Sequence, residues 1–208
     1  MWTGGSSSDA PSDEPESLYE FVDLGLPSGT LWATCNVGAT KPEESGLYFS
    51  WGEIEGYERP TEDKGFYIED YKFYINGSEN YSKYSEIDGL TELEKVDDAA
   101  YQSNNNCRMP NYNECIELIE NTEYKWQELN GVIGAKITSK INGNSIFIPG
   151  AGCCYEGIVE PGGALTWSST IGLSFEYGRD LAIGEDFFHV FNECYRSDGL
   201  PIRPVQNK

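Results

Sequence analysis

GVIGAKITSKINGNSIFIPGAG, residues 131–152, is the stretch that decides the fold. It places two apolar runs, 131–140 and 145–152, on either side of a short connection that contains Asn142 and Gly143. An Asn-Gly pair between two such runs is a strong hairpin signal, because both residues tolerate the positive φ that a tight hairpin turn needs. The stretch therefore predicts an antiparallel pair of strands in the second half of the chain.

Strand patterns recur on both sides of this hairpin. Near the start of the chain, the apolar positions Phe21, Leu24, Leu31 and Ala33 flank the turn at 26–29 and predict a second hairpin-like pair. Short apolar segments predict further strands at 165–170, 179–184, 186–191 and 200–205. So many short strands are typical of antiparallel sheets.

One amphipathic helix is expected within MPNYNECIELIENT, residues 109–122. Asn111 can cap its first turn, and Glu114 stands three residues later, as in a capping box. Cys115, Leu118 and Ile119 fall at helical spacing and form one apolar stripe, which should pack on a sheet. One good helix among many antiparallel strands predicts the α+β fold class.

The chain divides into an arm and one domain. Residues 1–18 are rich in Gly, Ser, Pro and acids, and predict a flexible tether. A single domain is expected over 19–208. Within it, residues 55–95 are acidic and rich in tyrosine, and predict a long excursion with little regular structure. A short helical turn is expected at 96–101.

Composition and charge narrow the class of function. Hydrophobic residues make up 38% of the chain, enough for a real core. The formal net charge is −21, and more than half of the acids fall in residues 1–100, so neither nucleic acid nor an anionic membrane is an expected partner. No apolar run approaches the roughly 18 residues that span a bilayer, so no membrane span is expected.

The six cysteines make neither a zinc site nor an obvious disulfide framework. They form no C-x-x-C pair, and the chain has 1 histidine, which argues against zinc. Adjacent cysteines do not easily bond each other, and six cysteines permit about 15 connectivities. We expect scattered, partly buried thiols at positions 35, 107, 115, 153, 154 and 194.

Several stretches, taken in order, resemble one known family. They are YEFVDLGLPSGTLWATCNVGATKPEESGLYFSWGE (19–53), DGLTELEKVDDAA (88–100), CRMPNYNECIELI (107–119), NGVIGAKITSKINGNSIFIPGAG (130–152), WSST (167–170) and GLPIRPV (199–205). Together they are similar to the Fibrobacter succinogenes major paralogous domain, over roughly residues 19–205. Two features depart from that family: Cys107 stands where it usually has Trp, and 171–198 lacks its usual run of Ser, Asn and Tyr.

The resemblance implies a fold and a setting. The family is related to C-type-lectin-like folds, which include formylglycine-generating enzymes and the variable proteins of diversity-generating retroelements. It is common on surface proteins and lipoproteins of Bacteroides-like bacteria, which implies an extracellular or cell-surface location. No activity is established for the family as a whole, so the resemblance implies a fold better than it implies a function.

The C-terminal segment 171–198 holds the candidate ligand-binding residues. In a strand, Phe187, His189 and Phe191 would share one face, while Phe188 and Val190 would share the other. In lectin-like variable proteins, the corresponding segment carries the ligand surface, and aromatic residues and Arg dominate binding hot spots. The candidates are Leu173, Phe175, Tyr177, Arg179, Phe187, His189, Phe191, Tyr195, Arg196 and Asp198.

Catalysis and metal binding have weaker signals. A serine hydrolase would need His189 as its base, and the chain has no G-x-S-x-G turn. A formylglycine-generating activity would need a pair of reactive cysteines, and Cys194 has no near partner in sequence. By resemblance, Asp88, Asp97 and Asp98 are candidate calcium ligands, although an acidic cluster that is solvated or caps a helix fits the same residues.

The expected function is non-catalytic recognition of an extracellular protein or glycan through the C-terminal aromatic segment. A receptor or adhesin diversified by a retroelement is one concrete version. The alternative is a structural or fimbria-like surface component, and an enzyme comes third. Calcium is the only cofactor considered, and the oligomeric state is left open.

Overall fold

The computed structural model describes residues 19–61, 64–78, 80–190 and 193–208. Strands and bridges account for 34% of the described residues and helices for 11%, with the strands short and antiparallel, which confirms the α+β class. The arm predicted at 1–18 lies outside the described residues. Within the described residues, no helix has the length and apolar character needed to cross a membrane.

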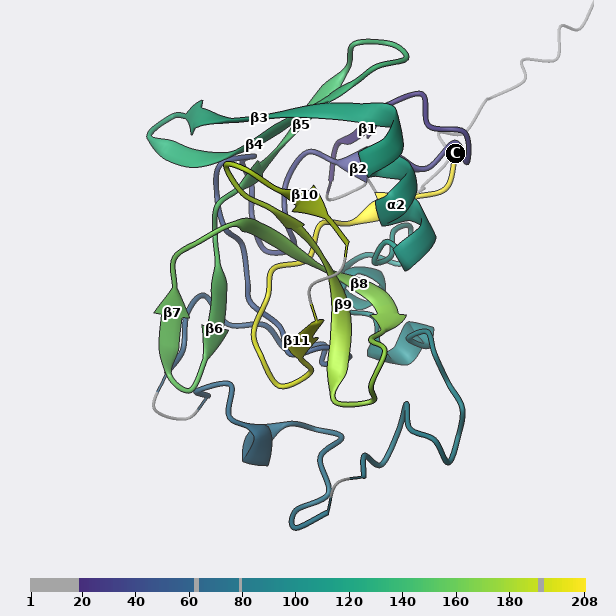
Figure 1. Ribbon diagram of the computed structural model, residues 1–208, viewed down its shortest axis with the longest axis vertical. Helices are drawn as coiled ribbons and strands as arrows, with labels where there is room; N and C mark the ends of the chain where they lie inside the picture. Colours follow the sequence, from purple (N-terminus) through teal and green to yellow (C-terminus); the bar gives the residue numbers. More distant parts are fainter. Residues whose placement is uncertain (1–18, 62–63, 79, 191–192) are drawn as a thin grey trace, which may run out of the picture.

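A three-stranded sheet with the order β3-β4-β5 forms one end of the domain (Figure 1). It consists of β3 (Thr122–Leu129), β4 (Val132–Ser139) and β5 (Ser145–Pro149). β4 and β5 pair antiparallel, with Thr138 opposite Ser145, which confirms the hairpin predicted around Asn142 and Gly143. Strand β3 was not predicted, although it pairs with β4 along its whole length.

The predicted helix is α2 (Tyr112–Asn121), and its capping box is present. The Asn111 side chain accepts a hydrogen bond from the backbone N–H of Glu114, and the Glu114 carboxylate accepts one from the backbone N–H of Asn111. Cys115 and Leu118 are fully buried, in an apolar cluster that also contains Trp32 and Ile137. The sequence therefore predicted both the start and the buried face of this helix.

The central sheet is built around β9 (Tyr177–Ile183). Strand β8 (Ala164–Ile171) pairs with one side of β9, and the register shifts between Trp167 and Ile171. Strands β10 (Phe188–His189) and β11 (Glu193–Tyr195) pair with opposite ends of β9 on its other side. The predicted strands at 165–170 and 179–184 are confirmed. Of the strand predicted at 186–191, the structure describes 186–190, and only the two residues of β10 are strand there.

The two ends of the described chain meet in a small sheet of order β1-β2-β12. Strands β1 (Phe21–Asp23) and β2 (Leu31–Ala33) form the predicted N-terminal pair, and β12 (Val205–Gln206) adds to β2. The strand predicted at 200–205 is mostly irregular, because Leu200 makes only a single bridge to Phe49. A separate hairpin consists of β6 (Cys153–Tyr155) and β7 (Ile158–Glu160).

Residues 55–95 run along the other end of the domain with little regular structure, as predicted (Figure 1). Their described residues include the 3-10 turn η1 (Ile68–Asp70) and isolated bridges, such as the one between Tyr74 and Tyr81. A second 3-10 turn, η2 (Lys95–Asp97), leads into α1 (Ala99–Ser103), the short helix expected near 96–101. Although irregular, the excursion contributes buried aromatic residues, so it is part of the packed domain.

Two apolar clusters form the core. One packs α2 against β4, β5 and β9, and includes Trp32. The other includes Trp51 and Trp167 and extends under residues 71–84. Arg203 is fully buried and donates to the Asn36 side chain and to the carbonyls of Ala33 and Phe147, so its role is structural.

Candidate functional site

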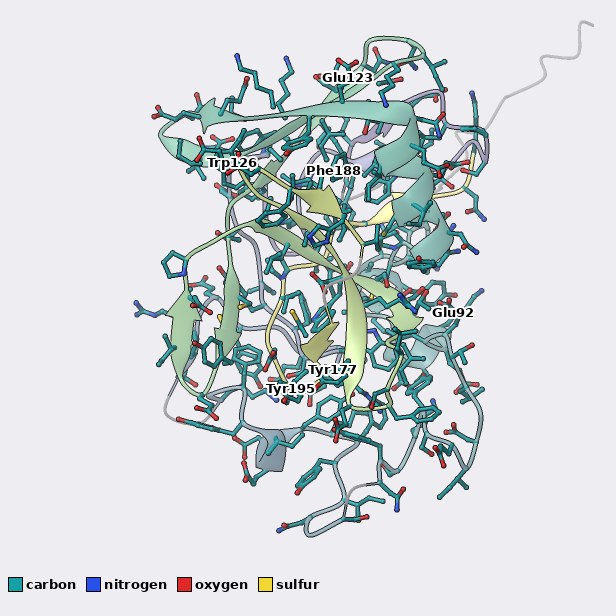
Figure 2. The ribbon with its side chains drawn as sticks, viewed as in Figure 1. Glu92, Glu123, Trp126, Tyr177, Phe188 and Tyr195 are labelled. Carbon is teal, nitrogen blue, oxygen red and sulfur yellow. The ribbon has the colours of Figure 1, made fainter. Side chains whose placement is uncertain are left out.

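Most of the predicted ligand-binding residues that the structure describes fall at two places, at opposite ends of β9. We call the first the tip surface and define it as Leu173, Phe175, Tyr177, Tyr195 and Asp198. Figure 2 shows Tyr177 and Tyr195 together at one end of β9, with Phe188 toward the other end. Seven residues of strand span about 20 Å, so the two places do not form one continuous site.

The tip surface is built by the connection from β8 to β9 and by the end of β11. The connection is a tight turn, in which the backbone N–H of Tyr177 donates to Ser174 and that of Gly172 donates to Tyr177. Tyr195 lies opposite Tyr177 in the register of β11 and β9, and their rings are 4.9 Å apart at 32°. Leu173 is 82% exposed and Tyr195 52% exposed. Apolar and aromatic groups are therefore presented to solvent from a hydrogen-bonded scaffold.

Arg196 does not belong to this surface, although the sequence suggested it. The side chain is fully buried. Its guanidinium donates to the Tyr71 hydroxyl and to the carbonyls of Lys83, Tyr84 and Phe175. Because its donors are directed at protein acceptors in the interior, Arg196 has a structural role, and we leave it out of the proposed binding surface.

Five aromatic rings surround the Arg196 guanidinium at 4.4 to 5.9 Å from the ring centroids. A buried cation among aromatic faces is stabilised by their electron-rich surfaces, and by more than at an exposed site. Four of the rings come from the excursion at 55–95, so Arg196 anchors that excursion to the end of β11. The rings belong to Trp51, Tyr71, Phe73, Tyr81 and Tyr84.

Asp198 closes the turn that follows β11. Its carboxylate accepts a hydrogen bond from the backbone N–H of Tyr195 at 3.1 Å. Burial, helped by the nearby Glu156 carboxylate, raises the pKa of Asp198 to about 7, although the hydrogen bond from Tyr195 acts to lower it. The charge of the tip surface therefore changes within the neutral and mildly acidic range.

Arg179 lies on β9 two residues beyond Tyr177, on the same face of the strand. Its guanidinium stacks over the Tyr112 ring at 4.4 Å from the centroid, and its side chain is only partly exposed. Arg179 therefore lies between the tip surface and the start of α2, where a ligand that extended along β9 would meet it.

Phe187 and His189 lie at the opposite end of β9, where β10 pairs with Ala182 and Ile183. The Phe187 and His189 rings are 5.3 Å apart, and Phe187 is 40% exposed. On the other face, Val190 is fully buried, while Phe188 packs on the core and against the Tyr124 ring. The expected inner face is thus observed for the residues described.

Phe191 lies outside the described residues.

The three candidate calcium ligands are each engaged by protein donors. Asp88 accepts three backbone hydrogen bonds within its own turn. Burial raises the pKa of Asp97, but Lys72, Lys83 and the Tyr84 hydroxyl donate to it and lower its pKa overall.

Asp98 is buried, caps α1 and accepts from the backbone N–H of Met109. Across the described part of the chain, no three His, Cys, Asp or Glu side chains are grouped as a metal ion would need. These contacts account for all three carboxylates as caps and ion pairs.

Burial raises the pKa of all six cysteine thiols, for example that of Cys154 to about 12. A thiol acts as a nucleophile only as the thiolate, which a lowered pKa would favour. All six are free of disulfide bonds, as expected from the sequence. Their environment gives no sign of an activated nucleophile.

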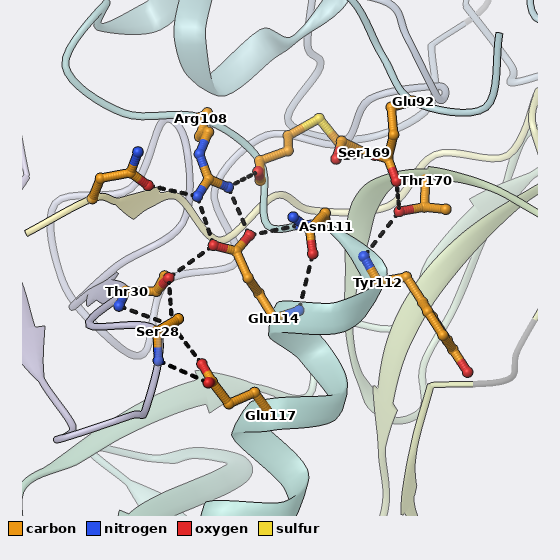
Figure 3. Close-up of polar contacts among 12 residues, drawn as sticks. Ser28, Thr30, Glu92, Arg108, Asn111, Tyr112, Glu114, Glu117, Ser169 and Thr170 are labelled. Atoms are coloured by element: carbon orange, nitrogen blue, oxygen red, sulfur yellow. Dashed lines mark hydrogen bonds and ion pairs between the residues drawn. The ribbon is translucent and has the colours of Figure 1, made fainter.

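A concave surface lies beside the start of α2. Figure 3 shows the polar contacts around it. There Arg108 donates to both oxygens of the Glu114 carboxylate at 2.6 Å and to the Asn207 side chain. Glu114 also accepts from Thr30, which links α2 to the N-terminal hairpin. The sequence signal is the amide-rich run SNNNCRMPNYN at 103–113, part of which also predicted the start of the helix.

Comparisons of the chain with protein-family models, with curated proteins and with solved structures found no match in any of the three. The family resemblance read from the sequence therefore stays a prediction. Any function for this chain has to be argued from its own geometry.

Proposed function

We propose that this domain recognises a ligand without catalysing a reaction, and that it binds through the tip surface. The observation that carries the proposal is the exposure of Leu173 and Tyr195 beside the stacked Tyr177, on backbone held by sheet and turn hydrogen bonds. Exposed apolar patches on otherwise well-packed domains mark interaction sites. Aromatic residues with polar tips are the side chains that most often dominate such interfaces.

The anchoring of the tip supports this function. Arg196, next in the chain to Tyr195, is bonded to the carbonyls of three residues in the interior. A surface that is already ordered loses less conformational freedom when it binds, so more of its contact energy appears as affinity. The elevated pKa values of the cysteine thiols agree with a role other than covalent catalysis.

A protein ligand suits the tip surface better than a glycan does. Leu173 is aliphatic and 82% exposed, and a hydroxyl-rich sugar gains little from contact with such a group. The chain also carries a net charge of −21, which favours a neutral or basic partner.

The wider proposal follows the family resemblance. It gives the domain a C-type-lectin-like fold and an extracellular or cell-surface setting, as a receptor or adhesin. The observed short antiparallel strands agree with that fold class at the level of α+β. A structural surface component is the alternative, and it predicts no ligand at the tip surface.

Binding can be tested with an array of extracellular proteins and glycans probed with three forms of the domain. The forms are the wild type, a Leu173→Ser, Tyr195→Ala double variant, and Ile133→Ser as a matched control. Ile133 is 48% exposed but lies on β4, far along the chain and in another sheet. We expect the wild type and the Ile133→Ser control to bind the same array members, and the double variant not to bind them.

Equal binding by all three forms would show that the tip surface is not the site. Binding of no array member by the wild type would favour the structural component instead. Thermal unfolding of each form checks that lost binding is not lost folding.

A further inference from the structure

A cleft of about 540 Å³ lies on a different part of the domain from the tip surface. Its walls come from the segment around α1, from the first turn of α2, and from β12 with the residue that follows it. This volume falls within the range of small-molecule sites. We call it the amide cleft, after four side chains on its rim: Asn105, Asn106, Asn113 and Gln206.

Each charged group that lines the amide cleft already contacts another group of the protein. Arg108 is paired with Glu114 through two hydrogen bonds of 2.6 Å. Glu92 accepts from the hydroxyls of Ser169 and Thr170 (Figure 3).

Asp98 is buried and accepts from backbone N–H groups. Lys95 lies over the Tyr101 ring at 4.9 Å from its centroid. The lining therefore carries two acids and two bases against a net charge of −21 for the whole chain, so it does not select a charged ligand.

The four rim amides are available to a ligand. Asn105, Asn106 and Asn113 are exposed and Gln206 is partly exposed. Within the described chain, their side chains make no hydrogen bond to another residue, whereas the neighbouring Asn111 and Asn207 are used for capping and for holding Arg108. Each amide offers both donors and an acceptor, and can therefore bond adjacent hydroxyls of one ligand.

We propose that the amide cleft binds a neutral saccharide. Its free polar groups are uncharged and bifunctional, which matches the hydroxyls of a sugar ring. Leu93 and the Tyr101 side chain, one face of whose ring Lys95 covers, supply the apolar part of the lining that the C–H face of a sugar contacts. The site is separate from the tip surface and does not depend on the function proposed for it.

The test is titration calorimetry with a panel of neutral oligosaccharides: maltopentaose, cellopentaose, xylopentaose and mannopentaose. Dextran sulfate serves as the charged comparison. We expect at least one neutral oligosaccharide to bind the wild type, and an Asn106→Ala, Asn113→Ala double variant to bind it at least tenfold more weakly. An Asn76→Ala variant is the matched control, because Asn76 is an exposed amide in the excursion.

Three outcomes would overturn the proposal: no neutral oligosaccharide binds at millimolar concentration, dextran sulfate binds in preference, or the double variant binds as the wild type does. A Tyr195→Ala variant separates the two sites. If it alone abolished sugar binding, the sugar would belong to the tip surface and the amide cleft would be rejected. Unchanged sugar binding by Tyr195→Ala, with loss in the amide variant, supports the amide cleft whatever the tip surface binds.

Discussion

The two ends of this domain are held together in different ways. The β3-β4-β5 end is ordered by ladders of backbone pairs and by helix α2 packed on them. The end formed by residues 55–95 has few backbone pairs, and side chains provide its order instead. Arg196 bonds the carbonyls of Lys83 and Tyr84, and Asp97 joins Lys72, Lys83 and the Tyr84 hydroxyl.

An irregular segment can therefore be as well packed as a sheet when polar side chains form hydrogen bonds with its backbone groups. Buried backbone groups must be paired in either case. In a sheet many similar hydrogen bonds stabilise the structure, so each contributes only a small part of the stability. In the excursion a few side chains make several bonds each, so single substitutions should have large and local effects.

The largest effect is expected from Arg196→Met. The substitution removes bonds to three carbonyls and the Tyr71 hydroxyl, and it leaves those acceptors buried. We expect the free energy of unfolding to fall by about 3–5 kcal/mol. Denaturant unfolding measures the loss, and hydrogen exchange should show fast exchange in residues 71–89 while β3, β4 and β5 stay protected.

Arg203→Met is the matched comparison. Arg203 is equally buried, but bonds Ala33, Asn36 and Phe147 at the other end of the domain. A similar loss of stability with exchange confined to that end would sharpen the contrast. Identical exchange patterns in the two variants would mean that the domain unfolds as one unit and that the contrast is only geometrical.

The next largest effect is expected in the pH dependence of stability, through the Asp198 carboxyl. Its pKa of about 7 in the folded state exceeds the ordinary value of 3.8, because burial disfavours the charged form. The folded state therefore holds this proton more tightly, so the stabilising contribution is complete below about pH 4 and is lost as the pH rises through 7. Asp198→Asn removes this titration and keeps an acceptor for the Tyr195 N–H.

As the pH rises from 5 to 8, we expect the free energy of unfolding of Asp198→Asn to increase relative to that of the wild type. The expected increase is on the order of 2 kcal/mol after allowing for partial exposure. Denaturant unfolding of both forms at each pH gives the difference. A constant difference across this range would show that Asp198 is not the titrating group.

A smaller effect is expected from Asn111→Ala at the ordered end of the domain. The substitution removes one half of the capping box of α2, and such losses cost about 1 kcal/mol. Asn113→Ala, an exposed neighbour in the same helical turn, should change stability far less. Equal losses in the two variants would mean that the cap adds nothing beyond helix propensity.

The smallest effect on stability is expected from Leu173→Ser. The side chain is 82% exposed, so the free energy of unfolding should change by less than about 0.5 kcal/mol. Thermal unfolding checks this expectation. A larger loss would show that Leu173 supports the turn between β8 and β9, and would weaken its assignment to the binding surface.

The contrast between the two ends also explains what the sequence could predict. The hairpin at Asn142 and Gly143 and the capping box at Asn111 and Glu114 depend on residues close in the chain, and both were found. Strand β3 was missed because it follows α2 directly at Thr122, with no Gly or Pro to mark the change. Local patterns therefore predicted the β3-β4-β5 end, except for β3, where no Gly or Pro marks the boundary with the helix.

The candidate site was less predictable because its geometry depends on distant residues. Tyr195 and Arg196 are adjacent in sequence and looked alike as binding residues, but one is 52% exposed and the other is fully buried. The difference arises from rings at positions 51 to 84, which no local pattern connects to Arg196. The amide cleft was missed for a similar reason, because Gln206 joins the asparagines only through the fold.

The turn at 195–198 has a consequence for how this protein can evolve. An exposed and a buried side chain are adjacent there, with Tyr195 at the surface and Arg196 in the interior. Replacing Tyr195 should change which ligands the surface binds without disturbing Arg196, which anchors the excursion. We expect lineages to vary freely at 173 and 195 and to keep arginine at 196, so that new binding specificities arise by single steps through folded intermediates.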